Sequence, residues 1–308
     1  MLQAGLVLII GFFLLIKGAD LFVEGASGLA LIFKVPPIVI GLTIVSFGTS
    51  TPEISVSIQS ALAGSSDLAL GNVIGSNIFN VLACVGLSTL AGNLLIPIST
   101  HKKDIPFMII VSLVFLVFLI TGLTLNRIEA IILLIILAVY IVDMLLDTYR
   151  HKVEDTSKPH TNLLKSIVLI SIGLLAIISG GDFVTTSAKT IALNLGLSET
   201  LIGLTIVAIG TSLPELLTSV IATKKGQTEI AIGNVVGSNI LNILFILGVS
   251  AAITPVFVDP KLLVDTGIMI AVFLLLYFAC RNKKVSKKEG FVFLLLFIIY
   301  NIYIIVRN

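Results

Sequence analysis

The sequence contains few charged residues: Asp, Glu, Lys and Arg together make up 12% of its 308 residues. A soluble globular domain carries about 25%, so the composition excludes a water-soluble globule, a nucleic-acid-binding protein and a disordered assembly. The net charge of +2 is too small to indicate a polyanionic partner. Hydrophobic residues make up 57% of the chain, and the mean hydropathy is +1.15. This composition predicts a protein that crosses the membrane several times.

Thiol and imidazole groups are equally scarce, with two cysteines and three histidines in the chain. Cys84 and Cys280 lie within apolar segments, show no disulfide or zinc spacing, and are predicted to be buried. His101, His151 and His160 lie in predicted loops between the apolar segments, which excludes a histidine metal site or proton relay within the membrane. We expect no cofactor. The N-terminus, MLQAGLVLIIGFF, has no basic start and is interpreted as a retained helix.

Long apolar segments dominate what is present. A bilayer core of about 30 Å takes about 20 helical residues. Segments that satisfy this length lie near 3–31, 36–64, 69–90, 105–123, 128–147, 164–193, 198–223, 229–251, 263–280 and 290–306. The predicted fold is therefore an all-α polytopic membrane protein with ten transmembrane helices and no soluble domain.

Basic residues are divided unequally between the two sides of this predicted bundle. Fourteen of the 19 Lys and Arg residues lie in or beside the connections that follow the odd-numbered segments, and three lie on the opposite side. Because basic residues accumulate on the cytoplasmic side, we expect both termini outside the cell. The predicted location is the cell (plasma) membrane.

A long internal repeat divides the chain in two. Residues 41–86 align with residues 203–248 at a constant offset of 162, without a gap, and 23 of the 46 positions are identical. Each half holds five predicted helices, an odd number, so the copies must face opposite ways. The predicted organisation is a first five-helix repeat at 1–147, a cytoplasmic linker at 148–163 and a second, inverted repeat at 164–308. Inverted repeats are typical of secondary transporters, although a channel or an enzyme could also be duplicated.

The repeated segment contains a break in a helix. Segment 36–64 would be about 43 Å long if it were straight, and it contains Gly48-Thr-Ser-Thr-Pro52-Glu53, in which the proline removes a backbone donor. The same break recurs at 210–215, which ends in Glu215. Carbonyls, hydroxyls and carboxylates gathered within a membrane indicate an oxygen-rich site for hard cations such as Na⁺ and Ca²⁺. A kinked packing helix is the alternative, and it accounts poorly for the two carboxylates.

Polar residues at intervals of four follow each break and share one face of a helix. They are Asn72, Ser76 and Asn80 in the first copy, and Asn234, Ser238 and Asn242 in the second. We expect this face to complete the oxygen-rich site. Hydrogen bonding between helices is the alternative, above all for Asn72, Asn77, Asn234 and Asn239.

At these residues the sequence resembles a known family. The pair GTSTPE…GNVIGSNIFN and GTSLPE…GNVVGSNILN is similar to the two α-repeats of the cation/Ca²⁺ exchanger superfamily, above all to those of prokaryotic sodium/calcium exchangers. The resemblance implies Ca²⁺-coordinating carboxylates at Glu53 and Glu215, and long first and sixth helices that slide as a gate. The whole implied ligand set is Glu53, Glu215, Thr49, Thr211, Ser50, Ser212, Ser76, Ser238, Asn80, Asn242, and, through their backbone, Ser46 and Ala208.

The same resemblance implies a transporter and not an enzyme. The implied reaction is electrogenic exchange of three Na⁺ for one Ca²⁺ by alternating access, with the two ions and the lipid bilayer as the partners and no protein partner evident. Asn242 stands where some prokaryotic members and the potassium-dependent branch carry Asp, which implies independence of K⁺. H⁺-coupled antiport of Ca²⁺ or another divalent cation is the second hypothesis, because the GNxxE acid of proton/calcium exchangers is replaced here by Gly75 and Gly237. A cation channel is the third.

Overall fold

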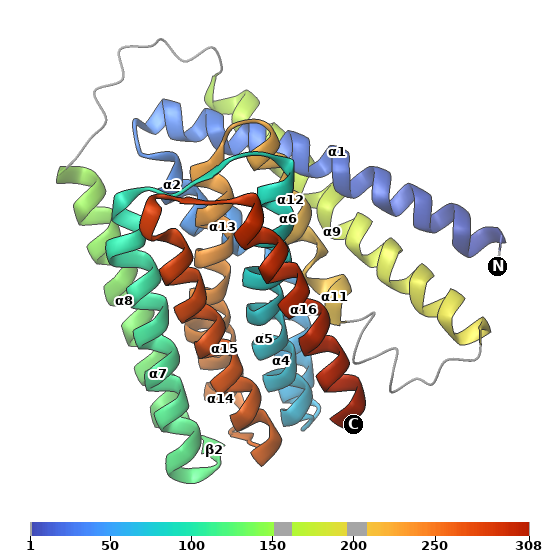
Figure 1. The fold of residues 1–308 in the computed structure, drawn as a ribbon, viewed down its shortest axis with the longest axis vertical. Helices are drawn as coiled ribbons and strands as arrows, with labels where there is room; N and C mark the ends of the chain where they lie inside the picture. Colours follow the sequence, from blue (N-terminus) through green and yellow to red (C-terminus); the bar gives the residue numbers. More distant parts are fainter. Residues whose placement is uncertain (1, 151–161, 196–207, 308) are drawn as a thin grey trace.

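The computed structural model describes residues 2–150, 162–195 and 208–307. Within these ranges the chain consists of helices, four strands of two residues each and short connections (Figure 1). Eight described helices are long and apolar enough to cross a membrane, and a further candidate span is a bent pair, Pro37–Thr49 and Thr51–Leu62, whose axes differ by 51°. The protein is thus an all-helical, multi-pass membrane protein. Residues 198–207 of the expected seventh span lie outside the described residues.

The described helices of the first half follow the expected order. They are α1 (Leu2–Phe33), α2 (Pro37–Ile40), η1 (Gly41–Val45), α3 (Ser46–Thr49), α4 (Thr51–Leu62), α5 (Ser66–Phe79), η2 (Asn80–Val85), α6 (Gly86–Ala91), η3 (Thr100–Asp104), α7 (Ile105–Gly122) and α8 (Arg127–Arg150). Those of the second half are α9 (Leu163–Asn194), α11 (Ala208–Thr211), α12 (Leu213–Lys224), α13 (Thr228–Leu241), η5 (Asn242–Leu247), α14 (Gly248–Ile253), α15 (Pro260–Ala279), η6 (Cys280–Asn282) and α16 (Lys287–Arg307). Except for the 3₁₀ turn η6, the η elements are π-helical turns.

One sequence expectation is wrong at the start of α7. The polar stretch at 101–104 was expected to be a connection between helices, with His101 in a loop. Instead Thr100–Asp104 forms the π-helical turn η3, which continues directly into α7. The turn packs inward: Thr100 and Asp104 are buried, and the His101 ring stacks on Tyr277 of α15 with 4.6 Å between centroids. His151 and His160 lie outside the described residues, whereas Cys84 and Cys280 are buried thiols as predicted.

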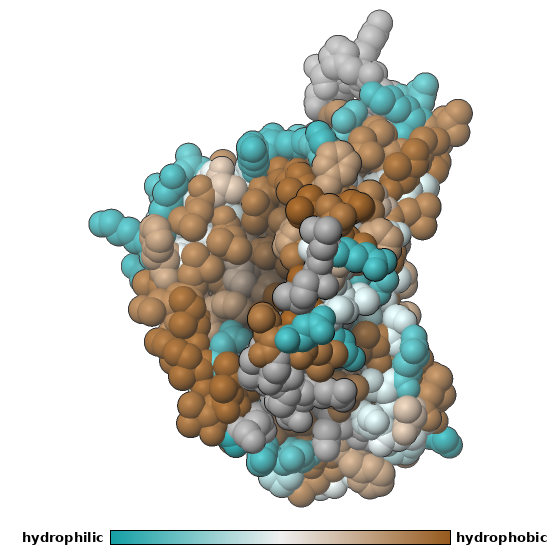
Figure 2. Space-filling view, turned by 90° about the vertical axis from the view of Figure 1, so that its right-hand side faces the viewer, coloured by the Kyte–Doolittle hydropathy of each residue, from teal (hydrophilic) through white to brown (hydrophobic). Residues whose placement is uncertain are grey.

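The centre of the bundle consists of the two helices that carry the polar face. In the span Thr228–Ile253, 94% of the apolar stretch is buried, against 11% in Lys287–Arg307. Small residues permit this burial, since a Cβ added at Gly237 would lie 2.7 Å from the Leu42 carbonyl oxygen. The outer helices instead turn apolar side chains outward, and Figure 2 shows hydrophobic residues over much of one side of the molecule. This arrangement places the polar residues of the repeat deep inside an apolar shell.

The long helices α1 and α9 lie side by side and obliquely to the other helices (Figure 1). Small residues face each other across this pair at intervals of seven, which we call the glycine seam: Gly11, Gly18 and Gly25 on α1, and Gly180, Gly173 and Ser166 on α9. A Cβ on Gly173 would lie 2.6 Å from the Phe22 backbone nitrogen, so glycine is required for the observed approach of the two backbones. The seam joins α1 and α9 into one unit.

Short strands join the two halves at both ends of the bundle. β1 (Leu94–Leu95) pairs antiparallel with β4 (Lys284–Val285), and β2 (Thr124–Leu125) pairs antiparallel with β3 (Val256–Phe257). Each pair takes one strand from the first half and one from the second. The halves are therefore connected at their ends as well as at the centre.

Candidate cation-binding site

Both breaks in the repeat are formed in the same way. Helix α3 ends at Thr49, Ser50 departs from helical geometry with φ −79° and ψ 8°, and α4 begins at the next residue with proline in its first turn. In the second copy Ser212 has φ −92° and ψ 4° between α11 and α12. Each break leaves a carboxylate, Glu53 or Glu215, in the first turn of the new helix, where the exposed backbone N–H groups favour negative charge.

The two carboxylates are held by serines of the opposite repeat. Ser212 Oγ donates to Glu53 Oε1 at 2.9 Å, and Ser50 Oγ donates to Glu215 Oε1 at 2.8 Å. Both glutamates are 1% exposed. The remaining oxygens, Glu53 Oε2 and Glu215 Oε2, are buried and have no hydrogen-bond partner among the described residues. Because a buried carboxylate oxygen without a donor is costly, these two atoms are suited to a cation.

The serines extend the same crossed contacts. Ser50 Oγ lies 3.0 Å from Ser238 Oγ, and Ser212 Oγ lies 3.0 Å from Ser76 Oγ. Ser238 Oγ in turn lies 3.5 Å from the Ser46 carbonyl oxygen. Each carboxylate therefore stands in a short chain of hydroxyl groups, in which the oxygen lone pairs can turn toward a bound ion.

Ser46 uses its side chain locally, because its hydroxyl donates to the Leu42 carbonyl at 2.8 Å. Its backbone carbonyl is the group that approaches the serine chain, which agrees with the backbone role implied for this position. Ala208 is the first residue of α11, and nothing is described of its side chain.

The threonines also bond across the repeats. Thr49 Oγ1 donates to Asn234 Oδ1 at 2.9 Å, and Thr211 Oγ1 lies 3.5 Å from Asn72 Oδ1. The structure thus places the glutamates, threonines and serines of the proposed set in two buried hydrogen-bonded groups, one around each glutamate, which together we call the cage. Its members come from the two broken helices and from α5 and α13.

Two serines that the sequence analysis missed support the cage from behind. Asn72 Nδ2 donates to Ser57 Oγ at 2.9 Å and lies 3.5 Å from the carbonyl of the glutamate in its own repeat. Asn234 Nδ2 makes the equivalent contacts with Ser219 Oγ at 3.0 Å and with a glutamate carbonyl at 3.2 Å. These asparagines therefore fix the backbone at the break, as the hydrogen-bonding alternative allowed. The signal was available, because both serines follow their glutamate by four residues in each copy.

Asn80 and Asn242 begin the π-helical turns η2 and η5. Their amide nitrogens donate to two further asparagines: Asn80 Nδ2 to Asn239 Oδ1 at 3.2 Å, and Asn242 Nδ2 to Asn77 Oδ1 at 2.9 Å. Asn242 Oδ1 is buried and, among the described residues, has no donor. Like Glu53 Oε2 and Glu215 Oε2, it is a buried acceptor oxygen without a donor in the described part of the chain.

The chemistry of these atoms is uniform. Glu53 Oε2, Glu215 Oε2 and Asn242 Oδ1 are all oxygens, and the described residues contain no group of three or more His, Cys, Asp or Glu side chains that could hold a metal ion. Two carboxylates surrounded by hydroxyl and amide oxygens suit Na⁺ or Ca²⁺ better than a transition metal.

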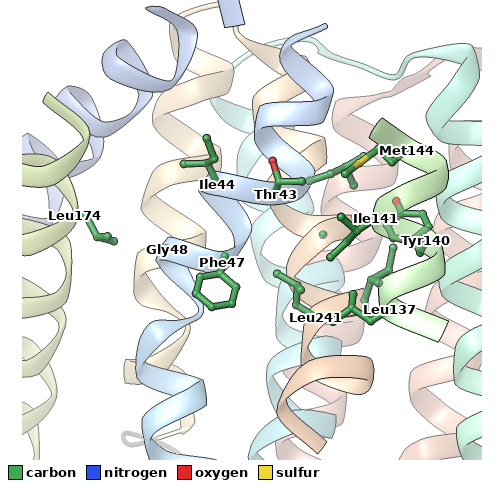
Figure 3. Close-up of a pocket in the computed structure, with 13 residues that line it drawn as sticks. Thr43, Ile44, Phe47, Gly48, Leu137, Tyr140, Ile141, Met144, Leu174 and Leu241 are labelled. Atoms are coloured by element: carbon green, nitrogen blue, oxygen red, sulfur yellow. The ribbon is translucent and has the colours of Figure 1, made fainter. Parts of the chain in front are cut away.

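An apolar pocket of about 490 Å³ lies beside the first broken helix, and it has a different character (Figure 3). Residues of η1, α3, α8, α9 and α13 line it. Its hydroxyls are already used, since Thr43 Oγ1 donates to the Val39 carbonyl at 2.6 Å and Tyr140 Oη to Asp104 at 3.1 Å. The pocket is therefore less suited to a cation than the cage.

Comparison with known proteins agrees with this chemistry. The sequence model of the family described as sodium/calcium exchanger protein matches residues 4–146 and 165–306. The chain belongs to the sodium/calcium exchanger family. The resemblance carried by the two motifs is therefore confirmed, and the protein is a member of a family of exchangers and not of enzymes.

This sodium/calcium exchanger family member is similar to its relatives over nearly its whole length. It is 31% identical to the sodium/calcium exchanger MaX1 of Methanosarcina acetivorans, with 96% of each chain covered. It is 34% identical to the inner membrane protein YrbG of Escherichia coli (strain K12), covering 94% of this chain and 92% of that one. A solved structure of the sodium-calcium exchanger NCX_Mj, soaked with Na⁺ and Ca²⁺, superposes with a TM-score of 0.86 at 31% identity and 97% coverage of both chains.

Proposed function

We propose that this protein is an antiporter that exchanges Na⁺ for Ca²⁺ across the plasma membrane by alternating access. The observation that carries the proposal is the pair of buried carboxylates, Glu53 and Glu215, each bonded by a serine of the other repeat and each left with one oxygen without a donor. The proposed ligands are Glu53, Glu215, Thr49, Thr211, Ser50, Ser212, Ser76, Ser238, Asn80, Asn242 and the backbone carbonyls of Ser46 and Ala208.

The proposed topology has ten helices in two inverted repeats, 1–147 and 164–308, with both termini outside. Eight long helices and the bent pair supply nine crossings, and the segment 198–223 supplies the tenth. The repeated break, its crossed hydrogen bonds and the uneven distribution of lysine and arginine support this arrangement.

Alternating access requires one part of the protein to move against another. The α1–α9 unit is the proposed mobile part, because its helices approach each other closely along the glycine seam. The Lys165–Glu24 ion pair (3.2 Å) lies within this unit, whereas the Lys225–Asp20 ion pair (2.6 Å) joins it to the end of α12. We propose that the unit moves as one body.

Charge counting supports electrogenic exchange. With Glu53 and Glu215 ionised, the Ca²⁺-loaded cage is neutral, since 2 − 2 = 0. Three Na⁺ give 3 − 2 = +1, so each cycle moves one elementary charge, which is worth about 2.3 kcal/mol per 100 mV. Asn242 supplies a neutral amide in place of a third carboxylate, and this supports transport without K⁺.

The decisive experiment is ⁴⁵Ca²⁺ uptake into proteoliposomes loaded with Na⁺, with K⁺ or with a low-pH buffer. We expect uptake from Na⁺-loaded vesicles alone, and we expect an imposed inside-positive potential, set with K⁺ and valinomycin, to increase it. Uptake driven by the low-pH buffer would instead support H⁺-coupled antiport. Voltage-independent flux with a two-to-one reversal point would reject three-to-one exchange, and unitary currents in a planar bilayer would indicate a channel.

A further inference from the structure

Two asparagines outside the proposed ligand set, Asn77 and Asn239, hold the amides of the two ligand asparagines. Asn77 Oδ1 accepts from Asn242 Nδ2 at 2.9 Å, and Asn239 Oδ1 accepts from Asn80 Nδ2 at 3.2 Å. Both contacts cross between the repeats. All four side chains are at most 1% exposed, so bulk water does not compete for these contacts.

The direction in which such an amide faces is as important as its presence. Its carbonyl oxygen attracts a cation. Its NH₂ group presents two hydrogen-bond donors and repels a cation. The two ends have nearly the same shape, so packing does not distinguish them, and hydrogen bonding must. A ligand asparagine rotated by 180° would replace a cation ligand with a cation-repelling group.

A backbone carbonyl sets this direction for Asn242. The Asn239 carbonyl oxygen can only accept, so Asn77 must turn Nδ2 toward it, at 3.4 Å. Met269 Sδ, a weak acceptor, lies 3.5 Å from the same nitrogen and favours the same orientation. Asn77 Oδ1 is then left to face Asn242, which must turn its own Nδ2 toward it. Asn242 Oδ1 consequently points away, buried and without a donor among the described residues.

The equivalent pair in the other copy has no such constraint. Asn239 Nδ2 is buried and has no partner among the residues that the structure describes, so no backbone acceptor fixes the direction of this amide. Asn80 Oδ1 lies 3.6 Å from Cys84 Sγ, a weak donor for which the second copy has Ile246. Identical asparagines thus have unequal surroundings.

We propose that Asn77 is a positioning residue that turns the carbonyl oxygen of Asn242, and not its NH₂ group, toward the transported cation. The proposal rests on the proposed function, because it takes Asn242 to be a ligand. Asn77 itself contacts no ion. The Asn239 backbone carbonyl orients the amide of Asn77, and this amide in turn orients that of Asn242.

The test compares Asn77→Ala in two backgrounds, the parent chain and Asn242→Asp. In the parent we expect the half-saturating Ca²⁺ concentration to rise about tenfold, the effect of an unsatisfied buried amide near a charge, with little change in the maximal rate. In the Asn242→Asp background we expect a change of less than about twofold, because a carboxylate presents an oxygen in either orientation. Both are measured as Na⁺-driven ⁴⁵Ca²⁺ uptake and as equilibrium ⁴⁵Ca²⁺ binding to purified protein.

The matched control is Asn239→Ala, which removes the partner of Asn80. Any rise in the half-saturating Ca²⁺ concentration that Asn239→Ala causes in the parent should also be seen in the Asn242→Asp background, because Asn80 remains an amide there. If Asn77→Ala folds poorly, Asn77→Ser can replace it, because a serine hydroxyl is polar but has no fixed direction. It should raise the half-saturating Ca²⁺ concentration in the parent and leave it nearly unchanged in the Asn242→Asp background.

Equal losses of Ca²⁺ affinity in the two backgrounds would overturn the proposal and leave Asn77 with a packing role. If the parent chain binds Ca²⁺ but does not exchange it for Na⁺, the proposed function fails while the binding comparison still decides the role of Asn77. A parent chain that binds no Ca²⁺ would overturn both.

Discussion

The two halves of the chain meet at the cage and at the glycine seam, and these two contacts are built in opposite ways. At the cage the contacting groups are hydroxyls, amides and carboxylates, and one oxygen of each glutamate keeps no donor among the described residues. At the seam the contacting groups are backbone atoms and small residues, with no space for even a methyl group at Gly173. One duplicated sequence therefore provides both a polar site, whose oxygens can change their bonding partners, and a close contact between two helix backbones, which is held by packing alone.

The largest effect is expected from substitutions that alter the cage and leave the seam intact. Glu53→Gln or Glu215→Gln should reduce Ca²⁺ transport by about 100-fold or more, because a divalent ion is left under-compensated in a low-dielectric site. The measurement is Na⁺-driven ⁴⁵Ca²⁺ uptake by folded, purified protein. Glu24→Gln is the control, since this half-exposed carboxylate pairs with Lys165 on the α1–α9 unit. Normal exchange by either cage variant would refute the assignment.

The next variant breaks the seam and spares the cage. Gly173→Ala places a methyl group 2.6 Å from the Phe22 nitrogen and 2.7 Å from the Gly18 oxygen, so the two backbones must separate. We expect a loss of about 1–3 kcal/mol in stability, visible as a lower melting temperature in detergent. Gly5→Ala, on the same helix pair but with no atom within 4 Å of the added carbon, should not lower it. Equal melting temperatures for both variants would mean that the contact between α1 and α9 accommodates an added methyl group.

A third variant changes the charge of the cage without removing a ligand. Asn242→Asp adds a third titratable carboxylate to a proposed site that already holds two, and like charges gathered in one buried site do not all stay ionised. Uptake of ⁴⁵Ca²⁺ should become more pH-dependent at mildly acidic pH than in the parent. An unchanged pH profile would place Asn242 outside the cage.

The smallest expected effect concerns the ion pair that connects the α1–α9 unit to the end of α12. Lys225→Gln removes the ion pair that joins α1 to the end of α12, whereas Lys165→Gln removes the pair within the α1–α9 unit. Exposed ion pairs contribute about 1 kcal/mol or less. We therefore expect Lys225→Gln to change the turnover rate by up to about fivefold and Lys165→Gln to leave it unchanged. Identical rates in both variants would argue against motion of α1 relative to α12.

The sequence predicted what each copy contains better than how the copies meet. Pro52 and Pro214, with a glutamate directly after each, marked the breaks correctly, because proline and a buried acid have strong local consequences. The crossed bonds were not predicted, since a constant offset of 162 relates equivalent residues and contains no information on which residue touches which. Thus the contact between Ser212 and Glu53 appears only in three dimensions.

Other features were visible in the sequence but were not used. The seven-residue spacing of Gly11, Gly18 and Gly25 is a packing signal that fits the partner spacing of Gly173 and Gly180. The π-helical turns that begin at Asn80, Asn242 and Thr100 were not predicted from the sequence.

The crossed bond between Ser212 and Glu53 also has a consequence for biosynthesis. The two residues are 159 positions apart, and a ribosome adds about 5–20 residues per second, so Glu53 is synthesised roughly 8–32 s before its partner. An ionised carboxylate without a partner is expensive in hydrocarbon. Glu53 must spend that interval hydrated or protonated, and a chain truncated after its first half never leaves this state, which offers membrane quality control a polar feature to recognise.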